Sequence, residues 1–379
     1  MKRPEKGELA KFWSLDPSTV FLNHGSFGAT PISVLEEQTK IRSRIEEDPV
    51  RFFERDYMPM MKESRGTLSE FLNAEVNGMT FVKNATEGVN TVLRSIELKP
   101  GDEIIVPNHS YQACWNAVDF VTERSGAKTV VVEIPFRIDS EEEIIDLILD
   151  KVTDRTVLAL IDTVTSPTGL RMPFERLVTE LQEKGVDVLL DAAHGPGIVP
   201  LDLASLDVAY CTGNCHKWIC TPKGSAFLHI REDRKSGVRP LVIGHGASLE
   251  GSDQERFEFE FGWPGTQDPS PWLCIPKAID HIGKMVDGGW SKIMHLNRDL
   301  VLRGREVICD ALGANPPVPE SMVASIASIE MPEGVEVGAM SMEGDPFHNF
   351  LLDEYGTQVP VFPWMHHGVR YIRISAQLY

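Results

Sequence analysis

Short apolar runs alternate with amphipathic segments between about residue 80 and residue 230, and this alternation constrains the fold more than any other feature of the chain. Such runs are typical of strands buried on both faces of a sheet, and intervening helices allow the strands to run parallel. The pattern therefore predicts an α/β domain with a mostly parallel sheet flanked by helices. The expected strands cover residues 80–82, 103–106, 129–133, 157–162, 187–191, 208–212 and 226–230, and the expected helices cover 88–95, 113–124, 141–151 and 174–183.

The segments on either side of this region predict further structure. Residues 31–72 are expected to be helical with an exposed charged face, interrupted at Pro49 and Pro59. A Pro- and Gly-rich stretch at 262–276 marks the expected exit from the large domain. Beyond it we expect a helix at 277–312, a strand near 324–331, a helix near 346–355 and a strand at 369–375. We therefore divide the chain into residues 1–20, which would pack with the small domain, a large domain of residues 21–265 and a small α+β domain of residues 266–379.

The composition argues against several classes of function. Basic residues number 37 against 56 acidic ones, and the resulting formal charge of −19 argues against nucleic acid or an anionic membrane as the main partner. The sequence shows neither a signal peptide nor an apolar run long enough to span a membrane. The six cysteines lack the spacing of a disulfide framework or a metal site, so we expect reduced thiols in a cytoplasmic protein without a metal.

The first polar cluster at a strand end is Asn84-Ala85-Thr86-Glu87-Gly88, between an expected strand and an expected helix. Ligand-binding residues of doubly wound sheets gather at the carboxyl ends of the strands. Thr86 is expected to cap the helix, and its hydroxyl together with the free backbone N–H groups of the first turn would bind a phosphate. The alternative is that Thr86 is only a helix cap.

Two more clusters directly follow apolar strands. Asp191, in DVLLDAAHG, has lost much of its hydration and needs a cationic or hydrogen-bonding partner, which a cofactor or a structural salt bridge would supply. Lys217, in TGNCHKW, follows the next strand and stands between His216 and Trp218. Such surroundings depress the pKa of a lysine, as an amine nucleophile requires, although an isolated lysine is ordinarily a solvated surface residue.

A phosphate-binding turn, a buried aspartate and a lysine are the three groups that pyridoxal 5'-phosphate (PLP) requires. At this point the sequence resembles the class V aminotransferase group of fold-type I PLP-dependent enzymes, and within it the isopenicillin N epimerase-like branch. The resemblance begins at Phe21 with FLNHGSFGATP, continues through NATEG, HSYQA, VTSPTG, DAAHGPG, TGNCHKW and GTQDP, and ends with RISAQLY. It therefore covers nearly the whole chain.

The resemblance implies roles for residues around the cofactor. Lys217 would form the Schiff base with PLP and carry the proton at the substrate Cα. Asp191 would pair with the pyridine nitrogen, and His194 would lie near the phenolic oxygen. The implied phosphate contacts are Ala85, Thr86, Asn214 and His216, together with Thr266 in GTQDP, which would reach the phosphate from the partner subunit of a homodimer with shared active sites.

The resemblance also implies which residues face the ring of the cofactor. Tyr111 would stack over the ring, with His109 as the alternative. Thr165 and Ser166 would face the ring, unless VTSPTG is only a turn.

The substrate, an amino acid, would meet a further set of residues. Arg373 would grip its α-carboxylate with a forked guanidinium, with Arg370 as the alternative. Asn23 and His24, in FLNHGSFG, are expected near the substrate at the mouth of the site. His24 would be the proton donor opposite Lys217, unless this segment is only a glycine-rich turn against the dimer partner. His366 and His367 would touch the substrate side chain or lie exposed on a loop.

The expected reaction begins when an amino acid displaces Lys217 from the cofactor and loses its Cα proton. Return of a proton from the opposite face gives epimerisation, which we expect first; the alternatives are β-elimination from a cysteine conjugate by a carbon–sulfur lyase, and transamination. A non-enzymatic scaffold is not expected, because Lys217 and Asp191 are both present. Residues 323–373 contain no cysteine, which argues against the persulfide chemistry of cysteine desulfurases. Relatives usually continue into another helix after the arginine strand, so we expect the small domain to be short or truncated.

Overall fold

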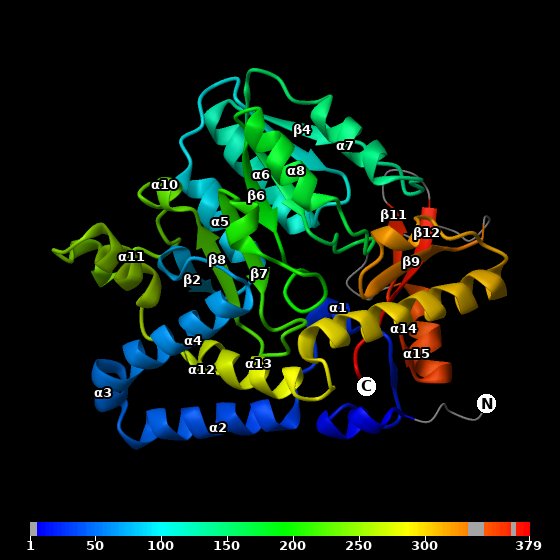
Figure 1. The fold of residues 1–379 in the computed structure, drawn as a ribbon, viewed down its shortest axis with the longest axis horizontal. Helices are drawn as coiled ribbons and strands as arrows, with labels where there is room; N and C mark the ends of the chain where they lie inside the picture. Colours follow the sequence, from blue (N-terminus) through cyan, green and yellow to red (C-terminus); the bar gives the residue numbers. More distant parts are fainter. Residues whose placement is uncertain (1–5, 333–344, 365–368) are drawn as a thin grey trace.

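A seven-stranded sheet forms the centre of the large domain in the computed structural model, which describes residues 6–332, 345–364 and 369–379 (Figure 1). The strand order is β2-β8-β7-β6-β5-β3-β4, and only β8 runs antiparallel to its neighbours. The predicted mostly parallel sheet is therefore confirmed. Its strands are β2 (Met79–Val82), β3 (Glu103–Pro107), β4 (Lys128–Val132), β5 (Thr156–Asp162), β6 (Asp187–Asp191), β7 (Tyr210–Asn214) and β8 (Ala226–Ile230).

Helices cover both faces of this sheet. Alternate residues of β5 show the division, because Leu158 and Leu160 pack in the cluster that contains α5 (Ala85–Ser95) and α6 (Gln112–Ser125). Ala159 and Ile161 instead pack in the cluster that contains α7 (Glu141–Leu149) and α8 (Phe174–Glu183). Because side chains alternate along a strand, the last residue of β5 faces the side of α5 and α6.

The segment before β2 is helical, as predicted for residues 31–72, but Pro59 does not interrupt its helix. The helices of this segment are α2 (Ile32–Glu47), α3 (Pro49–Arg51), a π-helical turn (Phe52–Asp56) and α4 (Tyr57–Phe71). Pro49 occupies the first position of α3, where its missing N–H costs nothing, whereas Pro59 lies in the first turn of α4 without ending it.

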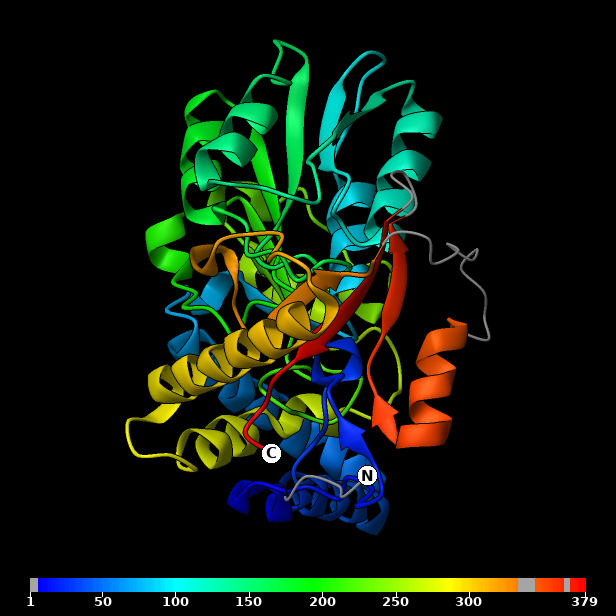
Figure 2. The same ribbon diagram turned by 90° about the vertical axis from the view of Figure 1, so that its right-hand side faces the viewer.

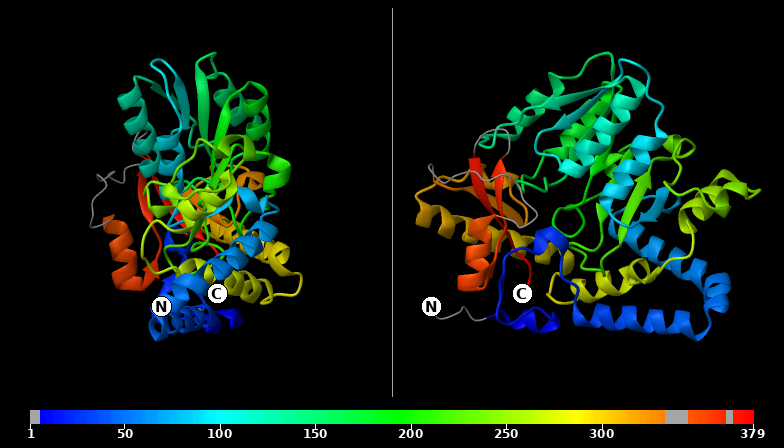
Figure 3. Two further views of the ribbon diagram at one scale, coloured as in Figure 1. Left: turned by 90° about the vertical axis from the view of Figure 1, so that its left-hand side faces the viewer. Right: turned by 180° about the vertical axis from the view of Figure 1, so that it is seen from behind.

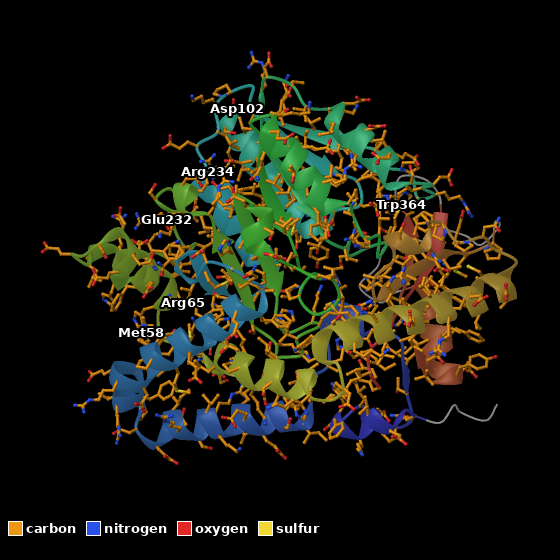
Figure 4. The ribbon with its side chains drawn as sticks, viewed as in Figure 1. Met58, Arg65, Asp102, Glu232, Arg234 and Trp364 are labelled. Carbon is orange, nitrogen blue, oxygen red and sulfur yellow. The ribbon has the colours of Figure 1, made fainter. Side chains whose placement is uncertain are left out.

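The expected domain boundary at residue 265 is too early. Both α12 (Ser270–Leu273) and α13 (Ile275–Gly283) pack on α2 and α4, and their apolar side chains belong to the main core of the large domain. The expected continuous helix at 277–312 is also wrong, because α13 ends at Gly283 and α14 (Gly289–Leu312) begins after Gly288, whose φ is +96°. Helix α11 (Asp253–Gly262), which the sequence analysis missed, projects from the large domain beside Met58 and Arg65 of α4 (Figure 4).

The small domain is built on a three-stranded antiparallel sheet of order β11-β12-β9. Its strands are β9 (Ile326–Glu330), β11 (Val361–Trp364) and β12 (Val369–Ser375), and α14 packs across this sheet (Figure 2). Helix α15 (Pro346–Tyr355) leads into β10 (Thr357–Gln358), which pairs with β1 (Val20–Phe21) near the N-terminus.

The N-terminal segment lies at the same edge of the molecule as α2 (Figure 3). A 3-10 helix (Glu8–Phe12) precedes Trp13, which packs with Ile282, Ile293 and Tyr379. A short helix, α1 (His24–Phe27), then enters the centre of the molecule between the two domains (Figure 1). Among the described residues, no helix is both long and apolar enough to cross a lipid bilayer.

Candidate active site

Lys217 lies in the loop that follows β7 and is only 9% exposed. Its Nζ atom is 3.0 Å from Nε2 of His194. Burial, and next the positive charge of Arg373, lower the pKa of Lys217 from 10.5 to about 8. The amine therefore loses its proton more readily than a surface lysine does.

His194 favours the uncharged form of this amine. The indole Nε1–H of Trp218 donates to Nδ1 of His194 at 3.1 Å, and burial holds the pKa of His194 well below its usual value. A neutral ring that accepts at Nδ1 carries its proton on Nε2, which points at Lys217. Lys217 must then accept this hydrogen bond with a free electron pair.

Two buried carboxyl groups end neighbouring strands close to Lys217. Asp191 accepts hydrogen bonds from the backbone N–H of Ala193 at 2.9 Å and from Sγ of Cys114 at 3.3 Å. Asp162, its register partner on β5, accepts from the hydroxyl of Ser110 at 2.8 Å. Burial raises the pKa of both, and the charge of Asp191 raises the pKa of Asp162 further. Asp162 was not predicted as a site residue, although it ends an apolar strand just as Asp191 does.

The N-terminus of α5 is held against the end of β7. Asn84 caps the helix by accepting from the N–H of Glu87 at 2.9 Å, so the expected cap at Thr86 is corrected: Thr86 lies inside the first turn. The N–H of Ala85 donates to Oδ1 of Asn214 at 2.9 Å, which joins two of the predicted phosphate contacts. A Cβ on Gly88 would lie 2.0 Å from Oγ1 of Thr212, so only glycine allows α5 to lie this close to β7.

His216 lies two residues after Asn214, the last residue of β7. Its Nδ1–H donates to the carbonyl of Ser225 at 2.9 Å, and burial lowers its pKa to about 4. In the neutral ring Nε2 is left as an acceptor.

Tyr111 remains the candidate for stacking over the cofactor. It is 45% exposed and directly precedes α6. His109, in contrast, is buried at the junction of the two domains, where its ring nitrogens contact Oγ1 of Thr168 at 2.8 Å and the carbonyl of Ile134 at 3.1 Å. This arrangement favours Tyr111 over His109.

The VTSPTG segment behaves as a turn that supports β12. The hydroxyl of Thr165 accepts from the N–H of Leu170 at 2.9 Å and bonds Oγ1 of Thr168 at 2.7 Å, so its hydrogen bonds lie within the turn. The carbonyls of Ser166 and Pro167 accept from Arg373 and from the hydroxyl of Tyr371. Thr165 is therefore part of this turn, and its place facing the ring stays a prediction.

Arg373 is the buried cation of the site. Its Nη2 donates to the hydroxyl of Ser26 at 2.8 Å, but its Nε is buried without a partner among the described residues. No carboxylate of the described residues forms an ion pair with it, and burial lowers its pKa to about 10. Arg370, the alternative, is already paired with Asp345. A buried arginine in this state is suited to bind a carboxylate ligand.

Asn23 and His24, which were also expected near the substrate, contact the neighbours of Arg373 and Lys217. Asn23 accepts from the hydroxyl of Ser26 at 2.5 Å and so supports the partner of Arg373. His24 lies behind Lys217, with both ring nitrogens engaged, and not on an open face of the site. His366 and His367 lie outside the described residues.

Thr266 is exposed and lines a surface hollow with Lys83, Glu87 and Gln267.

Comparisons with known proteins identify the family of this chain. Residues 32–309 match the family described as aminotransferase class V. The chain belongs to this class V aminotransferase family. It is 30% identical to a probable chloroplastic L-cysteine desulfhydrase of Arabidopsis thaliana, over 98% of this chain and 81% of the relative. It is 29% identical to isopenicillin N epimerase of Amycolatopsis lactamdurans, over 92% of this chain and 88% of the relative.

A solved structure shows the same fold. It is a variant of the protein C-DES with glycine covalently linked to its PLP cofactor, and it matches with a TM-score of 0.78 at 18% identity, covering 99% of this chain and 95% of the other. The predicted class V fold and cofactor are thus confirmed, and the chain is a PLP-dependent enzyme.

The residues present fit PLP. Asp191 is a buried carboxylate suited to a protonated ring nitrogen, and Lys217 is a buried amine of lowered pKa. The first turn of α5 and the free nitrogen of His216 are suited to a phosphate. These groups meet at the carboxyl ends of β5, β6 and β7, where ligands of such sheets bind.

Proposed function

We propose that this class V enzyme binds an amino acid through its carboxylate at Arg373 and removes the Cα proton with Lys217. The observation that carries the proposal is the Lys217 amine, buried 3.0 Å from His194 with its pKa lowered to about 8. Arg373, whose Nε has no hydrogen-bond partner among the described residues, would bind the substrate carboxylate. PLP, when bound, would supply a protonated ring that delocalises the electron pair left at Cα.

The arrangement of His24 bears on the outcome of the reaction. Epimerisation, which the sequence placed first, needs a second acid on the opposite face, and His24 was its candidate. Both ring nitrogens of His24 are instead bonded to Lys217 and Tyr379. β-Elimination needs only one base, so we place a carbon–sulfur lyase acting on cysteine or a cysteine conjugate first.

Two further observations support a lyase. The relative from Arabidopsis thaliana is named as a probable L-cysteine desulfhydrase. In this chain all six cysteines are buried, so a departing sulfur would leave as a free thiol or sulfide and would not be transferred to an exposed cysteine of the enzyme. Loss of the Cα proton and of the Cβ–S bond, followed by hydrolysis, gives pyruvate, ammonia and the sulfur product.

Epimerisation is the second candidate, because the isopenicillin N epimerase of Amycolatopsis lactamdurans matches over most of both chains. Transamination is the third. It would yield a keto acid without release of sulfur.

We also propose a homodimer in which Thr266 contributes to the partner's site. Leu241, Val242 and Ile243 are 39%, 52% and 59% exposed, and Leu241 and Val242 line the same hollow as Thr266. Adjacent exposed apolar side chains of this kind mark protein interfaces. Sedimentation velocity tests the proposal, and a monomer at micromolar concentration would contradict it.

The function is tested by incubating the holoenzyme with L-cysteine, S-substituted cysteines and a panel of L- and D-amino acids. We expect pyruvate and a thiol or sulfide in equal amounts from the cysteine substrates. Interconversion of configuration without pyruvate would instead establish an epimerase. Lys217→Ala should abolish the reaction, whereas Lys223→Ala, which changes an exposed lysine in the same loop, should not.

A further inference from the structure

His24 and Tyr379 come from opposite ends of the described chain and meet directly behind Lys217. His24 is fully buried, with Nε2 2.9 Å from the backbone carbonyl of Lys217 and Nδ1 2.6 Å from the hydroxyl of Tyr379. The His24 ring also packs on Trp218, with 4.8 Å between the ring centres. These contacts connect the tail after β12 to the backbone that carries the reactive lysine.

The direction of these hydrogen bonds follows from the groups involved. A backbone carbonyl can only accept, so Nε2 of His24 must carry a proton. Burial lowers the pKa of His24 to about 3, so the ring is neutral near pH 7 and has no second proton. Nδ1 is therefore an acceptor, and the hydroxyl of Tyr379 donates to it.

Gln377 lies beside the same ring but does not accept the His24 proton. Its Oε1 accepts from Nδ2 of Asn297 at 2.8 Å and from the N–H of Leu378 at 3.0 Å. Its amide nitrogen is therefore a donor, which bonds Sγ of Cys220 at 3.6 Å and lies 3.3 Å from Nε2 of His24. Two donors do not bond each other, so the Lys217 carbonyl is the acceptor for the Nε2–H of His24.

The backbone around Lys217 needs such support. A Cβ on Gly28, whose φ is +72°, would lie 2.2 Å from the carbonyl of His216 and 2.7 Å from that of Lys217, so the two segments are in close contact. Cys220, three residues after Lys217, has a φ of +62°, which is unfavourable for a residue with a side chain. Strained conformations of this kind persist only where surrounding contacts hold them.

We propose that Tyr379 and His24 are positioning residues for Lys217. The Tyr379 hydroxyl orients the His24 ring, and the Nε2–H of His24 holds the Lys217 carbonyl so that the amine stays against His194. This inference rests on the proposed function only in taking Lys217 as the lysine that reacts with the cofactor. It does not depend on which reaction follows.

The test measures Lys217 itself in the protein without cofactor. Competitive acetylation over a range of pH, read by mass spectrometry at Lys217, gives the midpoint at which its amine becomes reactive. We expect a midpoint near 8 in the wild type. Tyr379→Phe and His24→Ala should move it upward by about one unit, toward the ordinary value of 10.5, because the amine is no longer held in its buried position.

Two controls make the result specific. His24→Gln should restore most of the wild-type midpoint, since its amide N–H can donate to the Lys217 carbonyl. Tyr355→Phe changes an exposed tyrosine and should have no effect. A midpoint that stays near 8 in Tyr379→Phe, even with a lower unfolding temperature, would show a purely structural contact and overturn the proposal. Tyr379→Phe alone decides the matter if His24→Ala does not fold. Lack of activity toward amino acids would contradict the proposed function but leave this measurement valid.

Discussion

Asp162 and Asp191 are register partners at the carboxyl ends of β5 and β6, so two buried carboxyl groups stand on adjacent strands beside the cofactor site. Two neighbouring carboxylates do not both ionise readily in a buried site. Asp191 accepts from Ala193 and Cys114, whereas Asp162 accepts only from Ser110 among the described side chains. We infer that Asp162 carries the proton and Asp191 the charge.

This division predicts different effects of neutralising each carboxyl group. Asp191→Asn should weaken PLP binding by about tenfold to a hundredfold, because the charge that pairs with the ring nitrogen is lost. Asp162→Asn keeps the shape of a group that is already neutral and should change the affinity by less than about threefold. Titration of the protein with PLP measures both. Equal losses in the two variants would show that Asp162 also carries charge.

The two arginines of β12 should also differ in function. Arg373→Lys should raise KM for the amino acid by about tenfold or more, because lysine cannot bind a carboxylate through a planar fork. Arg370→Lys disturbs the ion pair with Asp345 and should lower stability while KM stays near the wild-type value. Steady-state kinetics of both variants provide the check. A larger rise in KM for Arg370→Lys than for Arg373→Lys would show that Arg370, and not Arg373, binds the carboxylate.

The close packing of Gly28 behind Lys217 can be tested with Gly66, in α4, as a control. Gly28→Ala should destabilise the protein by about 2 kcal/mol or more, because the new methyl group would overlap the carbonyl of His216 in a left-handed conformation. Gly66→Ala, in α4 with open space around it, should stabilise by about 0.5–1 kcal/mol. Urea unfolding of both variants measures the difference. A neutral Gly28→Ala variant would contradict the close contact.

Acid should destabilise the protein partly through His24. Its pKa in the folded state is lowered to about 3 from 6.5, so between these values the unfolded chain binds a proton that the folded chain does not. The free energy of unfolding must therefore fall as the pH decreases from 6.5 toward 3. His216 and His229, with pKa values of about 4, act in the same direction. His24→Gln should make this fall less steep by about 1.4 kcal/mol per pH unit, and an unchanged slope would contradict a buried neutral His24.

The sequence predicted the elements whose periodicity is clear and missed those whose pattern is ambiguous. Strands β6 and β8 and helix α8 have the predicted bounds, because the two strands are short, mainly apolar runs and the apolar residues of α8 recur with the helical period. Helix α11, in contrast, contains Phe257, Phe259 and Phe261 alternating with glutamates, which is also a strand pattern. The break between α13 and α14 falls at Asp287-Gly288-Gly289, a turn signal that the prediction of one continuous helix overlooked.

For the site, sequence order predicted the groups but not how they contact each other. Asp191 and Lys217 follow adjacent strands, so their proximity could be expected. The contact between His24 and Lys217 joins residues 193 positions apart, and that between Arg373 and Ser26 joins residues 347 apart. Such contacts depend on how α1 packs between the domains. The role expected for His24 therefore changed once its partners were known.

The central claim is that Lys217 removes the Cα proton of an amino acid bound at Arg373. The most direct measurement is proton NMR of the holoenzyme in D2O with L-cysteine, S-substituted cysteines and other L- and D-amino acids. We predict loss of the substrate α-proton signal with at least one of them, together with pyruvate from the cysteine substrates, and no loss with Lys217→Ala. Equal loss of the signal with Lys217→Ala, or none with any substrate for a wild-type enzyme that binds PLP, would contradict the account.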